Sequence, residues 1–212
     1  MKTRFIGDIH GKFHLYDRMV TDVAQSIQVG DFGVGFSSYD ESDTIFPGGN
    51  HRFIRGNHDN PAACKEHPNW IADGTIEGNT MYIGGAWSFD QAYRTIGVDW
   101  WDDEQCSMGG FYKLYSDYTE TKPEVMITHD CPQNVSIELF AWLKPEKSYV
   151  NVTNQGLEAM LAIHRPKLWI FGHWHTDIDV TLDGTRFLCL NEGSWIDIDT
   201  NGDLAEAHIQ QL

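Results

Sequence analysis

The stretch FIRGNHDN, residues 53–60, passes from an apolar pair to arginine, asparagine, histidine and aspartate placed around a single glycine. An apolar run that ends in glycine and polar residues is typical of a buried strand that stops at a loop. The same boundary occurs twice earlier in the chain, where residues 3–6 lead into GDIHG and residues 27–29 lead into GD. The question is whether these polar loops belong to one site.

Three further apolar runs follow the same plan. Residues 81–86 (MYIGGA) predict a fourth strand, residues 124–128 (EVMIT) predict a fifth that ends in His129, and residues 167–171 (KLWIF) predict a sixth that ends in GHWH. The carboxyl ends of strands are where α/β sheets place their ligand sites. Five of the ten histidines lie at these ends, so we expect the loops to assemble one site.

Helices and hairpins fill the remaining chain. Apolar residues at helical spacing predict helices over residues 12–27 and 154–164. Asp183-Gly184 predicts a hairpin, and Asn201-Gly202 predicts a second one. Residues 87–104 predict an irregular excursion with one helical turn. Strands that alternate with helices, followed by hairpins, predict an α/β fold of mixed sheets with helices outside.

Composition and charge narrow the classes of protein. With 212 residues, of which 41% are hydrophobic, the chain can build one core, and we expect a single domain over residues 1–212. The formal net charge of −16 disfavours extended nucleic acids and anionic membranes as partners unless bound cations reverse the charge locally. There is no apolar run of 18 residues, and the start of the chain has no signal-peptide pattern. The four cysteines show no CxxC spacing, which favours reduced thiols in a cytoplasmic protein.

The polar residues at the strand ends form a mixed nitrogen and oxygen donor set. Imidazole, carboxylate and carboxamide groups suit Mn²⁺, Fe, Zn²⁺ or Ni²⁺, and one carboxylate can bridge two such ions. Sulfur is absent from the set, which disfavours a structural zinc site. The sequence therefore predicts a site for such ions at the strand ends.

In order, the blocks GDIHG, GD, GNHD, THD and GHWH resemble the signature of the calcineurin-like metallophosphoesterase superfamily, D-x-H, G-D, G-N-H-[DE], H and G-H-x-H. The match runs from Asp8 to His175 and includes every ligand position of the signature. The segment GGAWSFDQAYRTIGVDWWDDE resembles the "GGA-S-D…R…WW" segment of bacterial and phage members. The resemblance implies a four-layer αββα sandwich, in which two mixed sheets are flanked by helices.

The resemblance also implies two divalent ions, of which Mn²⁺ is the favoured metal, with Fe, Zn²⁺ and Ni²⁺ as alternatives. The implied ligands of one ion are Asp8, His10, Asp31 and His175. The implied ligands of the other are Asp31, Asn57, His129 and His173, so that Asp31 bridges the two. His58 would face the phosphate and the leaving group as an acid or an electrostatic partner, and Asp59 would orient its ring.

The second block departs from the phosphoprotein phosphatases of the superfamily. Those enzymes carry GDxxDRG, whose arginine clamps the phosphate, whereas Val34 and Gly35 stand at the corresponding positions here. Arg55 precedes GNHD and either contacts the phosphate or forms a surface ion pair. Arg94, Trp100 and Trp101 are candidates for the substrate side, although the two tryptophans are also good packing residues.

The expected function is hydrolysis of phosphoesters, with a hydroxide that bridges the two ions as the nucleophile. A small-molecule or nucleotide-type phosphodiester or phosphomonoester is the expected substrate. Asp59 at the end of GNHD resembles the phosphodiesterase branch more than the Ser/Thr phosphatase branch. The alternatives are a phosphoprotein phosphatase, a nuclease, and a non-catalytic scaffold that keeps the fold.

Overall fold

Two mixed β-sheets form the centre of the protein in the computed structural model, which describes residues 2–36, 50–142, 150–199 and 208–211. The first sheet, sheet A, has the strand order β11-β10-β1-β2-β3. Its strands are β1 (Thr3–Ile6), β2 (Gln25–Gln28), β3 (Asn50–Phe53), β10 (Ser194–Ile198) and β11 (Gln210–Gln211). Strands β1, β2 and β3 are parallel, and β10 joins β1 in the antiparallel sense.

The second sheet, sheet B, has the order β4-β5-β6-β7-β9-β8. Its strands are β4 (Ile76–Glu77), β5 (Thr80–Ile83), β6 (Val125–Thr128), β7 (Leu168–Phe171), β8 (Ile178–Leu182) and β9 (Thr185–Cys189). The four central strands are parallel and the two edge strands are antiparallel. Every residue of β5, β6 and β7 is buried, as expected for parallel strands that are covered on both faces.

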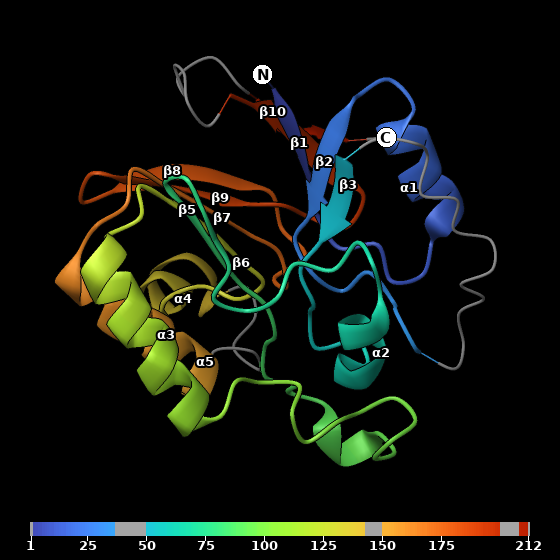
Figure 1. The fold of residues 1–212 in the computed structure, drawn as a ribbon, viewed down its shortest axis with the longest axis horizontal. Coiled ribbons are helices and arrows are strands. Elements are labelled where there is room, and N and C mark those ends of the chain that lie inside the picture. Colours follow the sequence, from blue (N-terminus) through green and yellow to red (C-terminus); the bar gives the residue numbers. More distant parts are fainter. Residues whose placement is uncertain (1, 37–49, 143–149, 200–207, 212) are drawn as a thin grey trace.

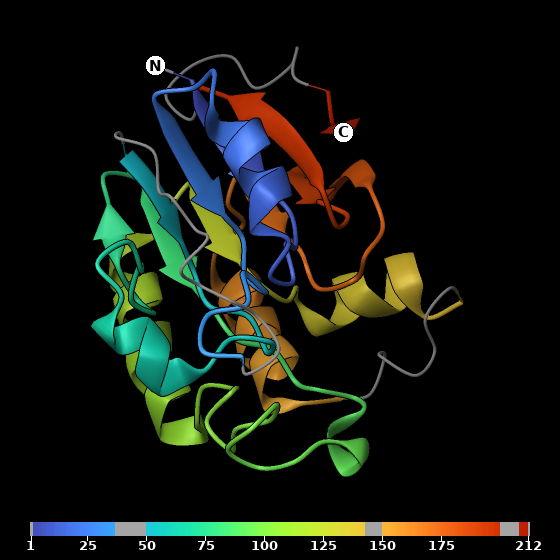
Figure 2. The same cartoon turned by 90° about the vertical axis from the view of Figure 1, so that its right-hand side faces the viewer.

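Helices cover the outer faces of both sheets (Figures 1 and 2). They are α1 (Phe13–Val20), α2 (Pro61–Glu66), α3 (Met108–Thr121), α4 (Gln133–Phe140) and α5 (Val152–Ile163). Helix α1 packs on sheet A, where Tyr16 and Met19 share a buried cluster with Ile6 and Phe53. Helices α3, α4 and α5 pack on sheet B. None of the described helices has both the length and the apolar character that crossing a membrane requires.

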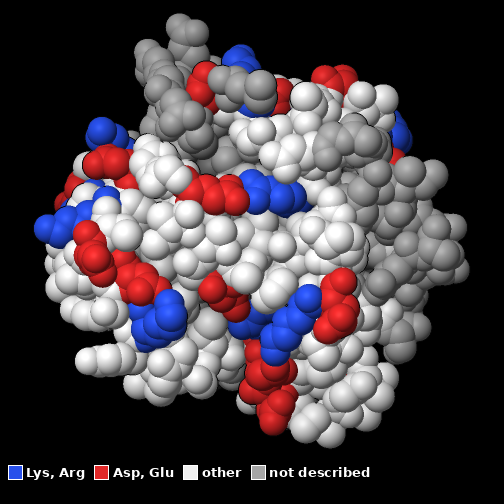
Figure 3. Space-filling model, viewed as in Figure 1, with Lys and Arg blue, Asp and Glu red and all other residues white. Residues whose placement is uncertain are grey.

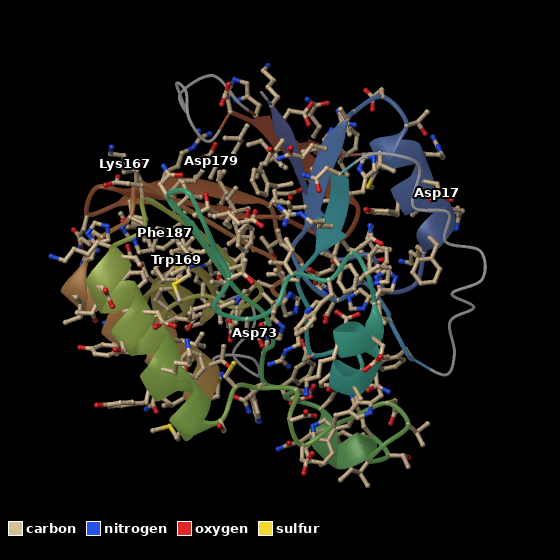
Figure 4. All side chains as sticks on the ribbon, in the orientation of Figure 1. Asp17, Asp73, Lys167, Trp169, Asp179 and Phe187 are labelled. Carbon is tan, nitrogen blue, oxygen red and sulfur yellow. The ribbon has the colours of Figure 1, made fainter. Side chains whose placement is uncertain are left out.

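Three apolar layers hold the four structural layers together. The middle layer joins residues of both sheets, such as Phe5 and Ile27 of sheet A and Ile127 and Ile170 of sheet B. The outer layer beneath α3 and α5 contains Trp169 and Phe187, whose rings stack with centroids 5.9 Å apart (Figure 4). The predicted αββα sandwich is therefore confirmed. A single domain over residues 1–212 stays a prediction, since parts of the chain lie outside the described residues.

The predicted helix over residues 12–27 is wrong in its second half. The helix ends at Val20, and Gln25–Gln28 form strand β2, which pairs with β1 and β3 on its two sides. Ile27 continued the helical spacing of the sequence, but sheet pairing on both sides outweighs that local pattern. The structure confirms the hairpin at Asp183-Gly184, whereas the one at Asn201-Gly202 lies outside the described residues.

Candidate metal centre

The predicted site forms where the loops after the strands of both sheets meet. Backbone hydrogen bonds tie these loops together. The N–H groups of Ile9 and His10 donate to Asp31 O at 3.0 and 2.8 Å, and the N–H of Gly172 donates to His129 O at 3.1 Å. His129 connects the two sheets, because its Nδ1 lies 2.8 Å from Val29 O, beyond the end of β2. The strand ends therefore bring together side chains that are far apart in the sequence, such as those of Asp8 and His175.

Four of the predicted ligands have an unusual backbone conformation. The φ angles of His10, Asp31, His173 and His175 are 48°, 58°, 66° and 47°. Residues other than glycine rarely adopt this left-handed region, and such conformations gather at functional sites, where the surrounding structure imposes them. The backbone conformation of these four residues therefore directs their side chains towards the candidate metal centre.

The first ligand cluster contains Asp8, His10, Asp31 and His175, with one donor atom of each within 4.8 Å of every other. Nε2 of His175 lies 3.0 Å from Oδ2 of Asp8 and 3.1 Å from Nε2 of His10. Nε2 of His10 lies 3.7 Å from Oδ2 of Asp31. This is the set predicted for the first ion.

The second cluster contains Asp31 again, with His129 and His173. Oδ1 of Asp31 lies 3.3 Å from Nε2 of His129. Asn57 completes the set, because its Oδ1 lies 3.2 Å from Nε2 of His129 and 3.0 Å from Nδ1 of His173. One carboxylate thus reaches both clusters, through Oδ2 in the first and Oδ1 in the second.

Both clusters fit divalent cations. Oδ2 of Asp8 is buried, and although Nε2 of His175 lies 3.0 Å away, no group among the described residues makes a hydrogen bond of good geometry to it, which is costly unless a cation neutralises the oxygen. Two histidine nitrogens that face each other at 3.1 Å suit a shared electrophile, since one proton at most can lie between them. Burial lowers the pKa of His129, but Asp31 outweighs this and raises it to about 9, so the centre attracts positive charge.

Burial alone would raise the pKa of Asp31, but His129, His58 and His10 outweigh burial and hold this pKa well below its usual range. Asp31 is therefore ionised at neutral pH, as a bridging ligand must be.

Two glycines allow the ligand loops to approach each other. A Cβ on Gly56 would lie 2.1 Å from Oδ1 of Asp31, so the sequence needs glycine there because of space. Gly30 has a φ of 101°, and its Cβ would lie 2.3 Å from Nδ1 of His129. The glycine before a ligand in one block is thus packed against a ligand of another block.

The role predicted for Asp59 is corrected by its contacts. Its oxygens do not hold the ring of His58 but accept four backbone N–H groups: Oδ1 those of Gly33 at 2.6 Å and Val34 at 2.9 Å, and Oδ2 those of Gly56 at 2.7 Å and Phe32 at 3.2 Å. Burial and the nearby Asp31 raise the pKa of Asp59, and three of these N–H groups oppose that shift. Asp59 fastens the loop of Asp31 to the loop of Asn57.

Arg55 also differs from both alternatives considered for it. The side chain is 6% exposed, and its Nε donates to Oδ2 of Asp73 at 2.9 Å. Its Nη1 donates to the carbonyl oxygens of Glu104 at 2.7 Å and Asp103 at 3.0 Å. The ion pair is buried rather than superficial, and the guanidinium is occupied by the protein itself. Arg55 anchors the end of the 87–104 segment.

Arg94 takes the place beside the site that was considered for Arg55. Its Nη2 lies 2.6 Å from Nε2 of His58 and 2.7 Å from Oδ1 of Asp90, and only 7% of the side chain is exposed. A guanidinium can only donate, so Nε2 of His58 accepts and the ring proton is assigned to Nδ1. Burial and Arg94 lower the pKa of His58 to about 4, although Asp31 opposes this shift. The predicted role of His58 as a proton-donating acid is therefore disfavoured.

Aromatic rings continue from His58 towards the 87–104 segment. Phe36 stacks on the ring of His58 at 5.5 Å, and Trp101 meets Phe36 edge-on at 5.5 Å. Trp100 closes a turn, because its carbonyl oxygen accepts the N–H of Gly97 at 2.8 Å. Trp101 is thus linked to His58 through the ring of Phe36, whereas the side chain of Trp100 lies near Glu104. The segment itself is irregular with one 3-10 turn, Gln91–Tyr93, as predicted.

Two residues of the site were missed at the level of sequence. Ser88 and Glu104 are buried, and Nδ2 of Asn57 donates to Oγ of Ser88 at 3.0 Å. Oγ of Ser88 in turn donates to Oε2 of Glu104 at 2.6 Å. The serine of the "GGA-S-D" resemblance was the one available signal, and Glu104 had none.

Known structures share this fold. A protein of Thermus thermophilus superposes with a TM-score of 0.53 at 11% identity, over 99% of this chain and 98% of its own. The anchor of the inner membrane complex of Plasmodium superposes with a TM-score of 0.53 at 9% identity, over 100% of this chain and 89% of its own. At such low identities the similarity establishes the fold alone.

A candidate 5′-nucleotidase of Staphylococcus aureus gives a TM-score of 0.51 at 12% identity and covers 99% of this chain. This chain spans about half of that protein, 52% of its length. None of the curated proteins compared with the sequence matches it. The family model described as calcineurin-like phosphoesterase matches residues 1–177, which include all seven residues of the two ligand sets. The chain therefore belongs to the calcineurin-like phosphoesterase family, whose members depend on divalent metals.

Proposed function

We propose that the protein hydrolyses a phosphoester of a small molecule or nucleotide at a centre of two divalent ions. The observation that carries the proposal is Asp31, whose two oxygens belong to two separate clusters of buried nitrogen and oxygen donors. When bound, two such ions supply a hydroxide nucleophile at neutral pH and neutralise the phosphoryl oxygens. Mn²⁺ is the metal that we favour, and Fe, Zn²⁺ and Ni²⁺ suit the same donors.

Arg94 is the protein group proposed to bind the phosphate. Gly35 stands where the phosphoprotein phosphatases of the family carry an arginine, and Arg55 is occupied by Asp73. Arg94 lies against His58, and His58 lies 4.8 Å from the ring of the ligand His10. Asp90 holds the guanidinium in place, so a phosphoryl oxygen entering beside His58 would meet a fixed donor. Neutral His58 accepts a hydrogen bond from Arg94 and so orients its guanidinium.

The aromatic rings favour a planar leaving group. Phe36 and Trp101 are each half-buried and extend from His58, so that each keeps a partly accessible surface. Stacking on such rings suits a nucleobase or another aromatic group. We therefore propose a nucleotide-type phosphodiester or phosphomonoester as the substrate.

The alternative functions have weaker support. On the face in Figure 3, the described Lys and Arg side chains lie among Asp and Glu side chains without forming a continuous stripe, and the net charge is −16. A nuclease usually needs basic residues for phosphate contacts along the strand. A phosphoprotein phosphatase would lack the second-block arginine of its branch. A scaffold would not need the complete ligand set. We also propose a cytoplasmic location, because all four cysteines are free thiols.

The function is tested by hydrolysis of bis-p-nitrophenyl phosphate and p-nitrophenyl phosphate by the chelated protein, with Mn²⁺, Fe²⁺, Zn²⁺ or Ni²⁺ restored singly. We expect no activity after chelation and recovery with Mn²⁺ for at least one of the two esters. Preference for the diester would favour the phosphodiesterase branch. Full activity after thorough chelation, or none with any of the metals, would contradict the proposal.

A further inference from the structure

The two ends of the 87–104 segment meet next to Asn57, where Glu104 is hydrogen-bonded to Ser88. Oε1 of Glu104 accepts the backbone N–H of Ser88 at 2.7 Å, and Oε2 accepts the hydroxyl of Ser88 at 2.6 Å. The same hydroxyl oxygen accepts Nδ2 of Asn57 at 3.0 Å. Ser88, Glu104 and Asn57 are 0%, 2% and 3% exposed, so this chain of hydrogen bonds is shielded from water.

The chemistry of these groups fixes the direction of every hydrogen bond in the chain. Burial raises the pKa of Glu104, and the two hydrogen bonds from Ser88 oppose this shift. When Glu104 is ionised, its carboxylate can only accept, so the single hydroxyl proton of Ser88 goes to Glu104. The hydroxyl oxygen is then left to accept, and the group of Asn57 that can donate is its NH₂. The oxygen of the amide must therefore point the other way, where it lies 3.2 Å from Nε2 of His129 and 3.0 Å from Nδ1 of His173.

We propose that Ser88 and Glu104 are positioning residues that hold the amide of Asn57 with its oxygen towards the second ion. This inference rests on the dinuclear centre of the proposed function. An amide turned by 180° would present N–H groups, which cannot bind a cation. Neither residue is a metal ligand, and outer partners of this kind tune the affinity of a site for its metal.

Glu104→Gln distinguishes orientation of the Asn57 amide from a merely structural role in which Glu104 joins the two ends of the segment. The oxygen of glutamine can still accept the backbone N–H of Ser88, so the two ends of the segment stay joined. Its NH₂ replaces Oε2 and donates to the hydroxyl of Ser88, which reverses the direction of the remaining hydrogen bonds. The hydroxyl proton then points at Asn57 and favours the turned amide. The substitution changes polarity while it keeps size and shape.

The test measures binding of Mn²⁺ to the chelated protein by calorimetry, for the wild type, Glu104→Gln, Ser88→Ala and the control Asp102→Asn. Asp102 is an exposed acid of the same segment, so its substitution removes the same charge. We expect an unchanged first ion and a second ion weakened about 10–100-fold in Glu104→Gln and Ser88→Ala, the range found for outer partners of metal ligands. Asp102→Asn should bind both ions as the wild type does. Wild-type affinity for both ions in Glu104→Gln would overturn the proposal.

Asn57→Asp provides the decisive background, because an aspartate offers oxygen at either end and needs no orientation. In Asn57→Asp, the further change Glu104→Gln should no longer weaken binding of the second ion, because the hydroxyl of Ser88 can then donate to the new carboxylate. If the full loss persists in this background, Glu104 has a merely structural role and the proposal is wrong. A wild type that binds one ion would overturn the dinuclear centre and this inference together. A wild type that binds two ions without hydrolysing any ester would contradict the proposed function alone.

Discussion

Two regions of the protein meet at the metal centre, and they reach it by different means. The loops after the strands position their ligands through the backbone. Asp31, His10, His173 and His175 have positive φ, Gly56 lies against Asp31, and Asp59 accepts four backbone N–H groups. The 87–104 segment contains one 3-10 turn and no strand, and it reaches the centre through the side chains of Ser88 and Arg94.

This difference separates two tasks. Backbone geometry set by two packed sheets places the ligands rigidly, and such a frame tolerates little change. Side chains on an irregular segment can be exchanged without disturbing the sheets, which is how binding residues are commonly carried on a scaffold. We therefore propose that the strand-end loops bind the metal ions and that the 87–104 segment recognises the substrate.

Asp31→Asn should have the largest effect and would test the backbone-built half. The bridging charge is lost from both clusters, so we expect weaker binding of both ions and a loss of activity of more than about 100-fold, beyond the usual range for outer partners of a metal ligand. Metal analysis and ester hydrolysis measure the two effects. Two tightly bound ions and normal turnover in this variant would show that Asp31 is no bridge.

Asp59→Asn should destabilise the protein by about 2–6 kcal/mol, because the new NH₂ group leaves two buried backbone N–H groups without an acceptor at about 1–3 kcal/mol each. Urea unfolding of the metal-free protein measures the loss. The exposed Asp102→Asn is the matched control and should change stability by less than about 0.5 kcal/mol. Equal stability of the two variants would refute the fastening role of Asp59.

The pH dependence of stability tests the contact between the two regions, where Arg94 of the 87–104 segment meets His58 of a strand-end loop. Its pKa is about 4 in the folded protein and 6.5 in the unfolded chain, so the unfolded state binds more protons between these values. Stability should fall as the pH is lowered from 6.5 towards 4, and His58 should contribute about 2 kcal/mol of this loss at pH 5. Urea unfolding of the metal-free wild type and His58→Gln at pH 7 and 5 isolates the contribution. The same pH dependence in both proteins would contradict it.

Arg94→Ala should lower activity less than Asp31→Asn does, and it tests the role of the 87–104 segment. Loss of a charged hydrogen bond to phosphate costs about 1.5–3 kcal/mol, so kcat/KM should fall about 10–150-fold. Both ions should remain bound, because the hydrogen bonds of Arg94 go to Asp99, His58 and Asp90, none of which is a predicted metal ligand. The exposed Lys113→Ala is a control of the same charge. Loss of metal together with activity would move Arg94 from recognition to support of the centre.

The clustering of the candidate ligands could be anticipated from the sequence because each candidate lies in a polar loop after a strand, and parallel strands end at the same edge of a sheet. The structure gathers Asp8, Asp31 and His129 as those strand ends predict. The positions of β5, β6 and β7 were also recognisable, because these strands are fully buried and therefore appear in the sequence as short runs of mainly apolar residues.

Helices α2, α3 and α4 and the role of Glu104 could not be anticipated in the same way. Helix α2 has six residues, and α3 begins with two glycines after Met108, which weakens its helical pattern. Glu104 lies in an acidic stretch with Asp102 and Asp103, and only the folded chain shows that it is the buried one. Contacts between distant residues that are set by packing leave no local pattern.

The number of bound ions, and whether they share a ligand, tests the bridging role of Asp31 most directly. The chelated wild-type protein is titrated with Mn²⁺, and bound metal is followed by equilibrium dialysis and electron paramagnetic resonance. We expect two ions per chain with a spin-coupled signal, since ions about 3.5–4 Å apart on one carboxylate interact magnetically. One ion per chain, or two ions with uncoupled signals, would contradict a centre bridged by Asp31.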